Sequence, residues 1–222
     1  MHPDDEYASR EEDGQGKTEM WYILDADEGA SLVYGLADGA SERDFCASVD
    51  AGNCMPVLRR VNVKKGDVFF IPAGMVHAIG KGIRIAEIQQ NCDLTYRVYD
   101  FDRVGADGKK RELHTEKAKA CVKALSDIEA EKIRFECKDS SDTERTLAHC
   151  RYFKTDLLEI EEKQSLGTDG SSFANLLALD GEGSIVYKGE HYPISCGDSY
   201  FIPATMGEYE IRGKLSVLKI EL

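Results

Sequence analysis

The stretch Gly66-Asp67-Val68-Phe69-Phe70-Ile71-Pro72-Ala73 returns 131 residues later as Gly197-Asp198-Ser199-Tyr200-Phe201-Ile202-Pro203-Ala204. A comparable run of β-forming residues follows each copy, at 83–88 after the first and at 215–220 after the second. Self-similarity at a fixed offset indicates a repeated structural unit. The repeat therefore predicts two similar domains, which we place at residues 1–126 and 127–222.

Short runs rich in β-branched and aromatic residues, separated by Gly and Asp turns, begin at Glu19 and are typical of a β-sandwich or barrel. The fold class is therefore expected to be mainly β with short helical insertions. Helices are predicted at 41–50, capped by Ser41, and at 115–125, with Thr115 as a possible cap. The predicted strands are 19–24, 31–36, 57–63, 67–71, 83–89 and 94–101, followed by a second series over 149–222.

The composition of the 222-residue chain, 42% hydrophobic and 31% charged, is typical of a soluble globular protein. Its net charge of −13 disfavours nucleic acid and anionic membranes as partners, although a few focused cations can still bind a small anion. The acidic start differs from a signal peptide, and no apolar run is long enough to span a bilayer. Seven widely spaced cysteines without a Cys-x-x-Cys pair suggest reduced thiols in the cytoplasm.

The first copy of the repeat continues to Gly74-Met75-Val76-His77, and this Gly, five residues, Pro-x-Gly-x-x-His pattern resembles the second motif of the cupin superfamily. Gly66 permits a tight turn, Pro72 directs the chain into the next strand, and His77 can act as a neutral imidazole ligand. The equivalent position in the second copy is Glu208. Only the first domain is therefore expected to hold a metal.

Two further motifs, His2-Pro3-Asp4-Asp5-Glu6-Tyr7 and Lys17-Thr18-Glu19-Met20-Trp21, resemble type I mannose-6-phosphate isomerases, as does the run from Gln89 to Phe101. In that family a Gln-x-His-Pro-Asp motif, a Lys-x-Glu-Met motif and the His of the turn bind zinc. The matching residues are His2, Glu19 and His77. The resemblance implies one zinc ion (Zn²⁺) per chain and two cupin-like (jelly-roll) β-barrel domains, and it is closest to the bacterial short form.

The sequence departs from the family at its start, because the Gln ligand would fall two positions before His2. Roughly the first third of the family's enzyme has no counterpart, so the first barrel is expected to be N-terminally truncated. A truncated gene, a misplaced start or a domain fragment would each give this sequence.

The resemblance implies interconversion of mannose 6-phosphate and fructose 6-phosphate, in which a proton moves between C1 and C2 and charge builds on their oxygens. Zinc with an open coordination position can polarise these oxygens. Lys17, two residues from Glu19, can place an ammonium beside the metal; otherwise it is a solvated surface lysine. Arg97 matches the family's active-site arginine; its alternative is a cross-strand salt bridge.

Two other functions stay open on the sequence alone. Two His and one carboxylate can also form an Fe(II) oxygenase site. The chain can instead be a truncated, catalytically weak or inactive cupin fragment that binds metal or sugar, or one that does not fold alone because a partly deleted barrel exposes unpaired strand edges. The catalytic base, the native start site, the oligomeric state and the role of the second domain are not determined by the sequence.

Overall fold

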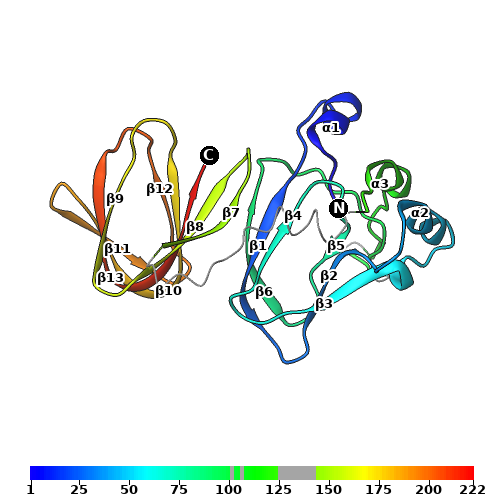
Figure 1. The fold of residues 1–222 in the computed structure, drawn as a ribbon, viewed down its shortest axis with the longest axis horizontal. Coiled ribbons are helices and arrows are strands. Elements are labelled where there is room, and N and C mark those ends of the chain that lie inside the picture. Colours follow the sequence, from blue (N-terminus) through cyan, green and yellow to red (C-terminus); the bar gives the residue numbers. More distant parts are fainter. Residues whose placement is uncertain (101–102, 106–107, 125–143) are drawn as a thin grey trace. The chain divides into compact units, whose positions relative to one another are not determined.

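The computed structural model describes residues 1–100, 103–105, 108–124 and 144–222, and it divides into two compact units, Met1–Ile133 and Arg134–Leu222. Both units are built mainly from β-strands, as the sequence predicts (Figure 1). The expected domain boundary at 126/127 lies outside the described residues. Among those that are described, no helix is both long and apolar enough to cross a membrane.

The first unit contains two antiparallel three-stranded sheets. The central strand of one sheet is β1 (Glu19–Ala26), which lies between β4 (Val68–Ile71) and β6 (Ile83–Gln89). The central strand of the other is β2 (Ser31–Leu36), which lies between β3 (Leu58–Asn62) and β5 (His77–Ala78). Five of the six strands predicted for this domain are therefore observed, with ends that differ by at most two residues.

Alternation along β2 gives the first unit two apolar layers. Leu32 packs against Trp21 and Phe69 of the facing sheet, whereas its neighbour Val33 packs with Phe45 and with residues from the helical side. Successive side chains of a strand point to opposite faces, so β2 serves both layers. Within the described residues, three helices complete the unit, α1 (Asp5–Glu11), α2 (Glu42–Asp50) and α3 (Thr115–Cys121), with a short 3₁₀ turn η1 (Met55–Val57).

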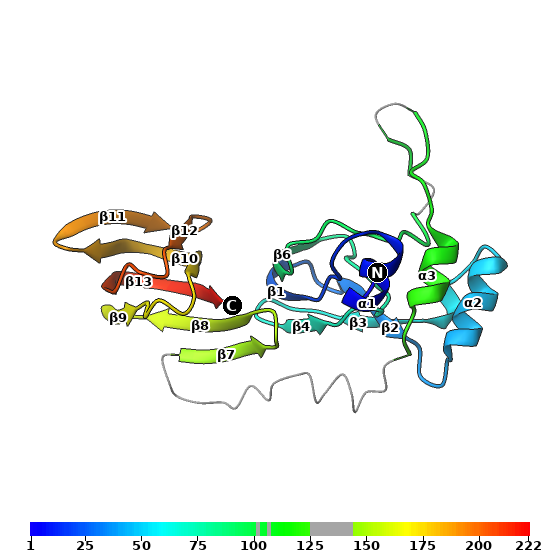
Figure 2. The same cartoon turned by 90° about the horizontal axis from the view of Figure 1, so that it is seen from above.

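Helix α2 begins as predicted. Ser41 accepts a hydrogen bond from the Asp44 amide, and the Asp44 carboxylate binds the Ser41 amide in return, which forms a capping box. Its buried residue Phe45 points into the helical layer, where α2 and α3 lie side by side in both views (Figures 1 and 2).

From Glu144 to Leu222, the second unit is one antiparallel sheet of seven strands organised around two 14-residue strands, β10 (Ala174–Tyr187) and β13 (Glu208–Glu221). The core is built from side chains that alternate along these strands, such as Leu176 on β10 and Val217 on β13. The remaining strands are β7 (Glu144–His149), β8 (Lys154–Ile160), β9 (Lys163–Gly167), β11 (Glu190–Ser195) and β12 (Ser199–Ile202). The series begins at Glu144, five residues before the predicted start.

The sequence repeat is also a repeat of strand pairing. In the first unit Glu19 of β1 pairs with Ile71 and with Gln89 on either side. In the second unit Ala174 of β10 pairs with Ile202 and with Glu221 in the same way. The two copies of the motif therefore place β4 and β12 in equivalent registers, and the residue equivalent to Glu19 is Ala174.

The predicted strand at 94–101 is wrong over its described part. Residues 94–100 form no β-ladder, because their backbone groups bind to loops and to the start of the chain. The amide of Tyr96 donates to the carbonyl of Met1, and the carbonyl of Arg97 accepts from the amide of His114. Aromatic and β-branched residues favour extended backbone here, but no strand in the described part of the chain pairs with 94–100. Phe101 lies outside the described residues.

The predicted helix at 115–125 is shorter than expected. Helix α3 ends at Cys121, because Val122 adopts ψ 137° and the amide of Lys123 donates to the carbonyl of Gly74. Thr115 is the first helical residue and not the cap; His114 is the cap residue and makes no capping hydrogen bond through its side chain. Leu125 falls outside the described part of the chain.

Candidate metal centre

His77 is positioned by the turn that precedes it. The amide of Met75 donates to the carbonyl of Pro72, which closes the turn, and β5 begins at His77. The His77 Nδ1 atom lies 2.9 Å from the carbonyl oxygen of Met75. Because a carbonyl can only accept, Nδ1 carries the proton, and the lone pair of Nε2 is directed away from the turn.

His2 is held by the same turn and by neighbouring loops. The amide of Gly74 donates to the carbonyl of His2 at 2.8 Å, and the amide of Lys17 donates to the carbonyl of Pro3 at 3.0 Å. The His2 Nδ1 atom lies 2.6 Å from the carbonyl oxygen of Leu94. His2 is buried, with 4% of its surface exposed. Both imidazoles are therefore oriented by backbone carbonyls, an arrangement that is common for metal-binding histidines.

Glu19 supplies a carboxylate between the two rings. It is the first residue of the central strand β1, and its side chain is only 1% exposed. Its Oε2 atom lies 3.3 Å from His2 Nε2, and its Oε1 atom lies 3.3 Å from His77 Nε2. The two Nε2 atoms are 3.1 Å apart. The three predicted metal ligands thus meet at one point.

The donor atoms of His2, Glu19 and His77 are better suited to binding a small cation than to binding one another. Two Nε2 lone pairs face each other at 3.1 Å, and the buried Glu19 Oε2 accepts no hydrogen bond in the described part of the chain, although His2 Nε2 and the Lys17 ammonium lie within ion-pair distance of it. Buried polar atoms without partners are costly, so a cation between them would remove the cost. Tetrahedral zinc ligands stand about 3.3 Å apart, because each lies about 2.0–2.1 Å from the metal. Among the described residues, this is the group of His, Cys, Asp and Glu side chains that could hold an ion.

The electrostatics of the cluster keep His77 and Glu19 in forms that could bind a metal. Burial lowers the pKa of His77 well below its ordinary value, so this imidazole is neutral at pH 7. Burial alone would raise the pKa of Glu19, but its contacts with His2, His77 and Lys17 outweigh that effect and hold the pKa at about 2. A neutral imidazole and an ionised carboxylate are the forms that bind a metal.

Lys17 lies beside the cluster, where the sequence predicts it. It also contacts Glu87, a residue that the sequence motifs do not indicate. Its Nζ atom is 3.2 Å from Glu19 Oε2 and 3.2 Å from Glu87 Oε1. Glu87 lies on β6 opposite Trp21 of β1, on the face of the sheet that carries Glu19. Only the register between β1 and β6 reveals this pairing, because 70 residues separate Lys17 from Glu87.

Arg97 lies on the wall of a cavity of about 750 Å³, which is also lined by His77 and Trp21. The Arg97 Nη1 atom donates to the carbonyl of Glu112 at 3.0 Å, and the Trp21 ring meets the His77 ring edge-on with centroids 5.3 Å apart. The structure therefore joins all five predicted site residues to one region. Three of them form the cluster, Lys17 contacts it, and Arg97 lines the cavity that reaches His77.

The comparisons with known proteins agree with this fold and site. A family profile described as "Mannose-6-phosphate isomerase, cupin domain" matches residues 143–222. The chain is 39% identical to mannose-6-phosphate isomerase ManA of Bacillus subtilis over 96% of the chain and 67% of that relative. It is 34% identical to the mannose-6-phosphate isomerase of Streptococcus mutans over 98% of the chain and 68% of that relative.

A solved structure extends the same relationship to three dimensions. The chain superimposes on the mannose 6-phosphate isomerase from Bacillus subtilis with a TM-score of 0.88 and 32% identity, covering 100% of this chain and 70% of that one. The fold is thus the cupin type of that enzyme. The resemblance over the first domain and the profile match over the second place both halves in one protein family. This chain belongs to the mannose-6-phosphate isomerase family of enzymes.

Proposed function

We propose that this protein is a zinc-dependent enzyme that interconverts mannose 6-phosphate and fructose 6-phosphate. The observation that carries the proposal is the buried cluster of His2, Glu19 and His77 at the edge of a cavity large enough for a hexose phosphate. One zinc ion per chain would satisfy the two Nε2 atoms and the carboxylate. The relatives named above carry out this kind of isomerisation by name.

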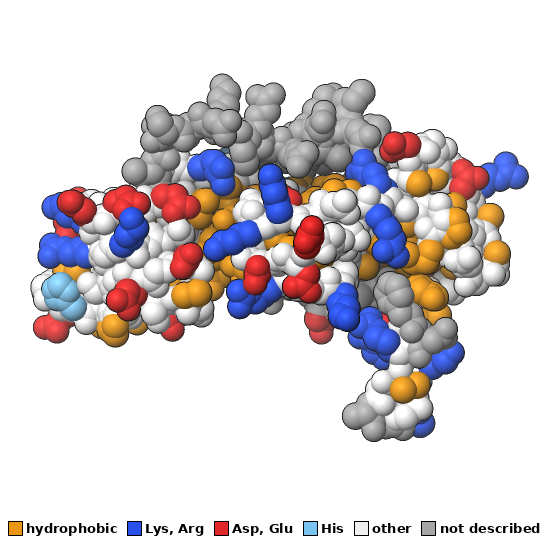
Figure 3. All heavy atoms as spheres, turned by 90° about the horizontal axis from the view of Figure 1, so that it is seen from below, with side chains coloured by type: hydrophobic (Ala, Val, Ile, Leu, Met, Phe, Trp, Pro, Cys, Tyr) orange, Lys and Arg blue, Asp and Glu red, His pale blue; other side chains and the backbone are white. Residues whose placement is uncertain are grey.

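The charge of the cavity wall supports a phosphorylated substrate. Five cationic residues and one acid, Asp100, line the cavity, whereas the chain as a whole has a net charge of −13. On the face drawn in Figure 3, acidic and basic side chains are interspersed. Cations gathered on a concave surface raise the local concentration of an anion. The five cations are Arg60, Lys81, Arg97, Arg103 and Arg111.

The residues beside the cluster can assist the transfer of a proton between C1 and C2 of the sugar. A bound zinc ion would supply Lewis acidity toward the substrate oxygens. Lys17 holds an ammonium between Glu19 and Glu87, where it can stabilise negative charge that develops on the sugar. Glu87 is 32% exposed and contacts Lys17 through one oxygen, which leaves a carboxylate on the site face that can accept a proton. We propose Lys17 and Arg97 as catalytic residues and Glu87 as the candidate base.

We also propose that the protein works in the cytoplasm. The six described cysteines carry free thiols, which persist where the cell keeps cysteines reduced.

The decisive experiment measures metal content and turnover in the same purified sample. Elemental analysis should find one zinc per chain, and a coupled assay should detect fructose 6-phosphate formed from mannose 6-phosphate. His77→Ala should lose both. The matched control is His191→Ala, which removes an exposed histidine of the second unit and should retain both. Folded protein without zinc or turnover would overturn the proposal, and stoichiometric iron with oxygen uptake would establish the oxygenase alternative in its place.

Lys17→Met separates catalysis from metal binding. It removes the ammonium but leaves the three ligands, so the zinc content should persist while kcat falls by about 10²–10³-fold. A Lys17→Met protein with unchanged kcat would remove Lys17 from the catalytic set.

A further inference from the structure

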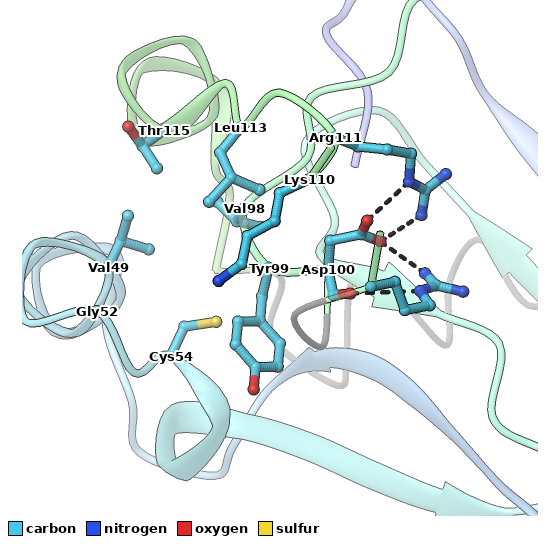
Figure 4. Close-up of a pocket in the computed structure, with 11 residues that line it drawn as sticks. Val49, Gly52, Cys54, Val98, Tyr99, Asp100, Lys110, Arg111, Leu113 and Thr115 are labelled. Carbon is cyan, nitrogen blue, oxygen red and sulfur yellow. Dashed lines mark hydrogen bonds and ion pairs between the residues drawn. The ribbon is translucent and has the colours of Figure 1, made fainter. Parts of the chain in front are cut away.

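Asp100 is a buried carboxylate that lies between two arginines of the cavity wall. Its side chain is 7% exposed, whereas those of Arg103 and Arg111 are 63% and 47% exposed. Arg103 Nη2 donates to Asp100 Oδ1 at 2.7 Å, and Arg111 Nε donates to Oδ2 at 2.7 Å. The Nη2 atom of Arg111 also contacts Oδ1, so this pair is bidentate. Figure 4 shows the carboxylate pointing toward Arg111, with dashed lines to both guanidinium groups.

The carboxylate is ionised in this arrangement and fixes the planes of both guanidinium groups. Hydrogen bonds from Arg111 and Arg103 hold the pKa of Asp100 well below its ordinary value. Arg103 makes a further bond through Nε to the carbonyl oxygen of Asp100 at 3.3 Å, so both arginines are tied to the same residue. An exposed arginine otherwise samples many rotamers, and fixing it in advance lowers the cost of binding a ligand.

The bonds to Asp100 leave donors for a ligand. Arg111 uses its Nε–H and one Nη2–H on the carboxylate, which leaves three of the five N–H donors of a guanidinium. The Asp100, Arg103 and Arg111 side chains all line the cavity that His77 lines. Two guanidinium groups and one carboxylate leave one net positive charge at this wall. A planar donor fork suits an oxyanion with several acceptor oxygens.

We propose that Asp100 is a positioning residue, which fixes Arg103 and Arg111 in the cavity wall so that the remaining N–H groups of Arg111 bind the phosphate of the sugar-phosphate substrate. This inference rests on the proposed function, since it names how that site selects a phosphorylated sugar. Asp100 does not touch the substrate and acts through the two arginines.

Whether Asp100→Asn raises or lowers the KM for mannose 6-phosphate distinguishes a positioning role from a purely electrostatic one. Removing a negative charge from the cavity wall makes the wall more positive, and by charge alone that would lower the KM for an anionic substrate. Loss of the hydrogen bonds to the Asp100 carboxylate instead leaves both guanidinium groups free to change rotamer, so substrate binding must order them and the KM rises. We expect the KM for mannose 6-phosphate to rise by about tenfold, as for a lost charge-assisted hydrogen bond, while kcat changes by less than about threefold.

Inorganic phosphate provides a direct probe of the same subsite. As a competitive inhibitor it should have a Ki that rises with KM in Asp100→Asn, because it needs the same arginines. Arg111→Lys keeps the charge but loses the bidentate pair, and it should raise both constants in the same way. Asp38→Asn removes an exposed acid from a turn that does not line the cavity, and it should leave both constants unchanged.

A double-mutant cycle tests whether Asp100 acts through Arg111. If it does, Asp100→Asn should add little in the Arg111→Ala background, so the combined effect on KM falls clearly short of the product of the single effects. Because the Arg111 side chain is exposed, Arg111→Ala is expected to fold. Its effect on KM and on the Ki of phosphate can therefore still be measured if Asp100→Asn does not fold.

An unchanged or lowered KM in Asp100→Asn, or independent effects in the cycle, would overturn the inference. The proposed function would stand in that case, because it is decided by zinc and turnover in the unsubstituted protein.

Discussion

Replacing Gly74 by alanine should disturb the metal centre from outside its ligand set. Gly74 has φ +90°, a conformation that residues with a side chain rarely adopt. A Cβ atom at this position would lie 2.8 Å from the carbonyl oxygen of Cys121 and equally close to the Lys123 side chain. The same residue donates its amide to the carbonyl of His2 and accepts a bond from the amide of Lys123. Any shift that relieves the clash therefore moves an anchor of His2.

The magnitude follows from two separate costs. The positive φ costs a side-chain-bearing residue about 1–2 kcal/mol. Because backbone atoms as well as a flexible side chain lie in the way, overpacking adds about 1–3 kcal/mol. We therefore expect Gly74→Ala to lower the free energy of unfolding by about 2–5 kcal/mol. Displacement of His2 should weaken zinc binding by about 10–100-fold, the range for residues that orient a metal ligand.

Gly39→Ala is the matched control, because Gly39 has φ +79° but nothing within 4 Å of the added Cβ atom. It should show only the cost of the positive φ, about 1–2 kcal/mol, and normal zinc affinity. Urea unfolding of the zinc-free proteins gives the free energies, and competition with a chromophoric chelator gives the affinities. If Gly74→Ala matched Gly39→Ala in both measurements, the contact through Gly74 would not position His2.

Four further predictions concern single groups in the two units. The buried hydroxyl of Tyr209 has no hydrogen-bond partner among the described residues, so Tyr209→Phe should leave stability unchanged or raise it by up to about 1 kcal/mol. Tyr96→Phe removes a 2.7 Å bond to Glu12 and should lower stability by about 1–2 kcal/mol in the same urea assay. Ser41→Ala removes the cap of α2 and should cost about 1 kcal/mol. Ala174→Glu overpacks a fully buried position, which should cost about 1–3 kcal/mol at any pH. It also buries a carboxylate without a cation; burial raises the folded-state pKa, so the additional cost of ionisation should be small at pH 5 and grow to about 3 kcal/mol by pH 8 in the same urea assay.

Local sequence signals predicted most of the fold, because the elements concerned are decided by nearby residues. The capping box of Ser41 with Asp44 needs only a three-residue spacing, and the β4 turn needs Gly66 and Pro72. Residues 94–101 have the composition of a strand, but a strand also needs a neighbouring strand with which to pair. The backbone groups of Tyr96 and Arg97 instead bind to Met1 and His114. Helix α1 is not among the helices predicted from the sequence. In the structure Asp4 is the N-cap, accepting the Tyr7 amide, and the acidic first turn suits the helix dipole.

The ligand cluster could be predicted from motifs, whereas its supporting groups could not. His2, Glu19 and His77 each stand in a recognisable motif, and the structure brings them together. The carbonyls of Leu94 and Met75 that orient the imidazoles carry no side-chain signature, so no sequence pattern could have indicated them. The roles that we propose for Lys17 and Arg97 concern chemistry and stay predictions until they are tested.

The repeat explains why one unit should hold a metal and the other should not. Both units place a central strand between the same two partners, so the residues equivalent to Glu19 and His77 are Ala174 and Glu208. Ala174 is fully buried in an apolar core, whereas Glu208 is exposed at the start of β13. A centre requires several donors that converge on one point, and the loss of any one leaves the others buried and unpaired. In the second unit the residues at two equivalent positions therefore do not repeat the Glu19 and His77 donors, and a core of alternating apolar side chains packs the same strand pairing, so the metal is expected in the first unit.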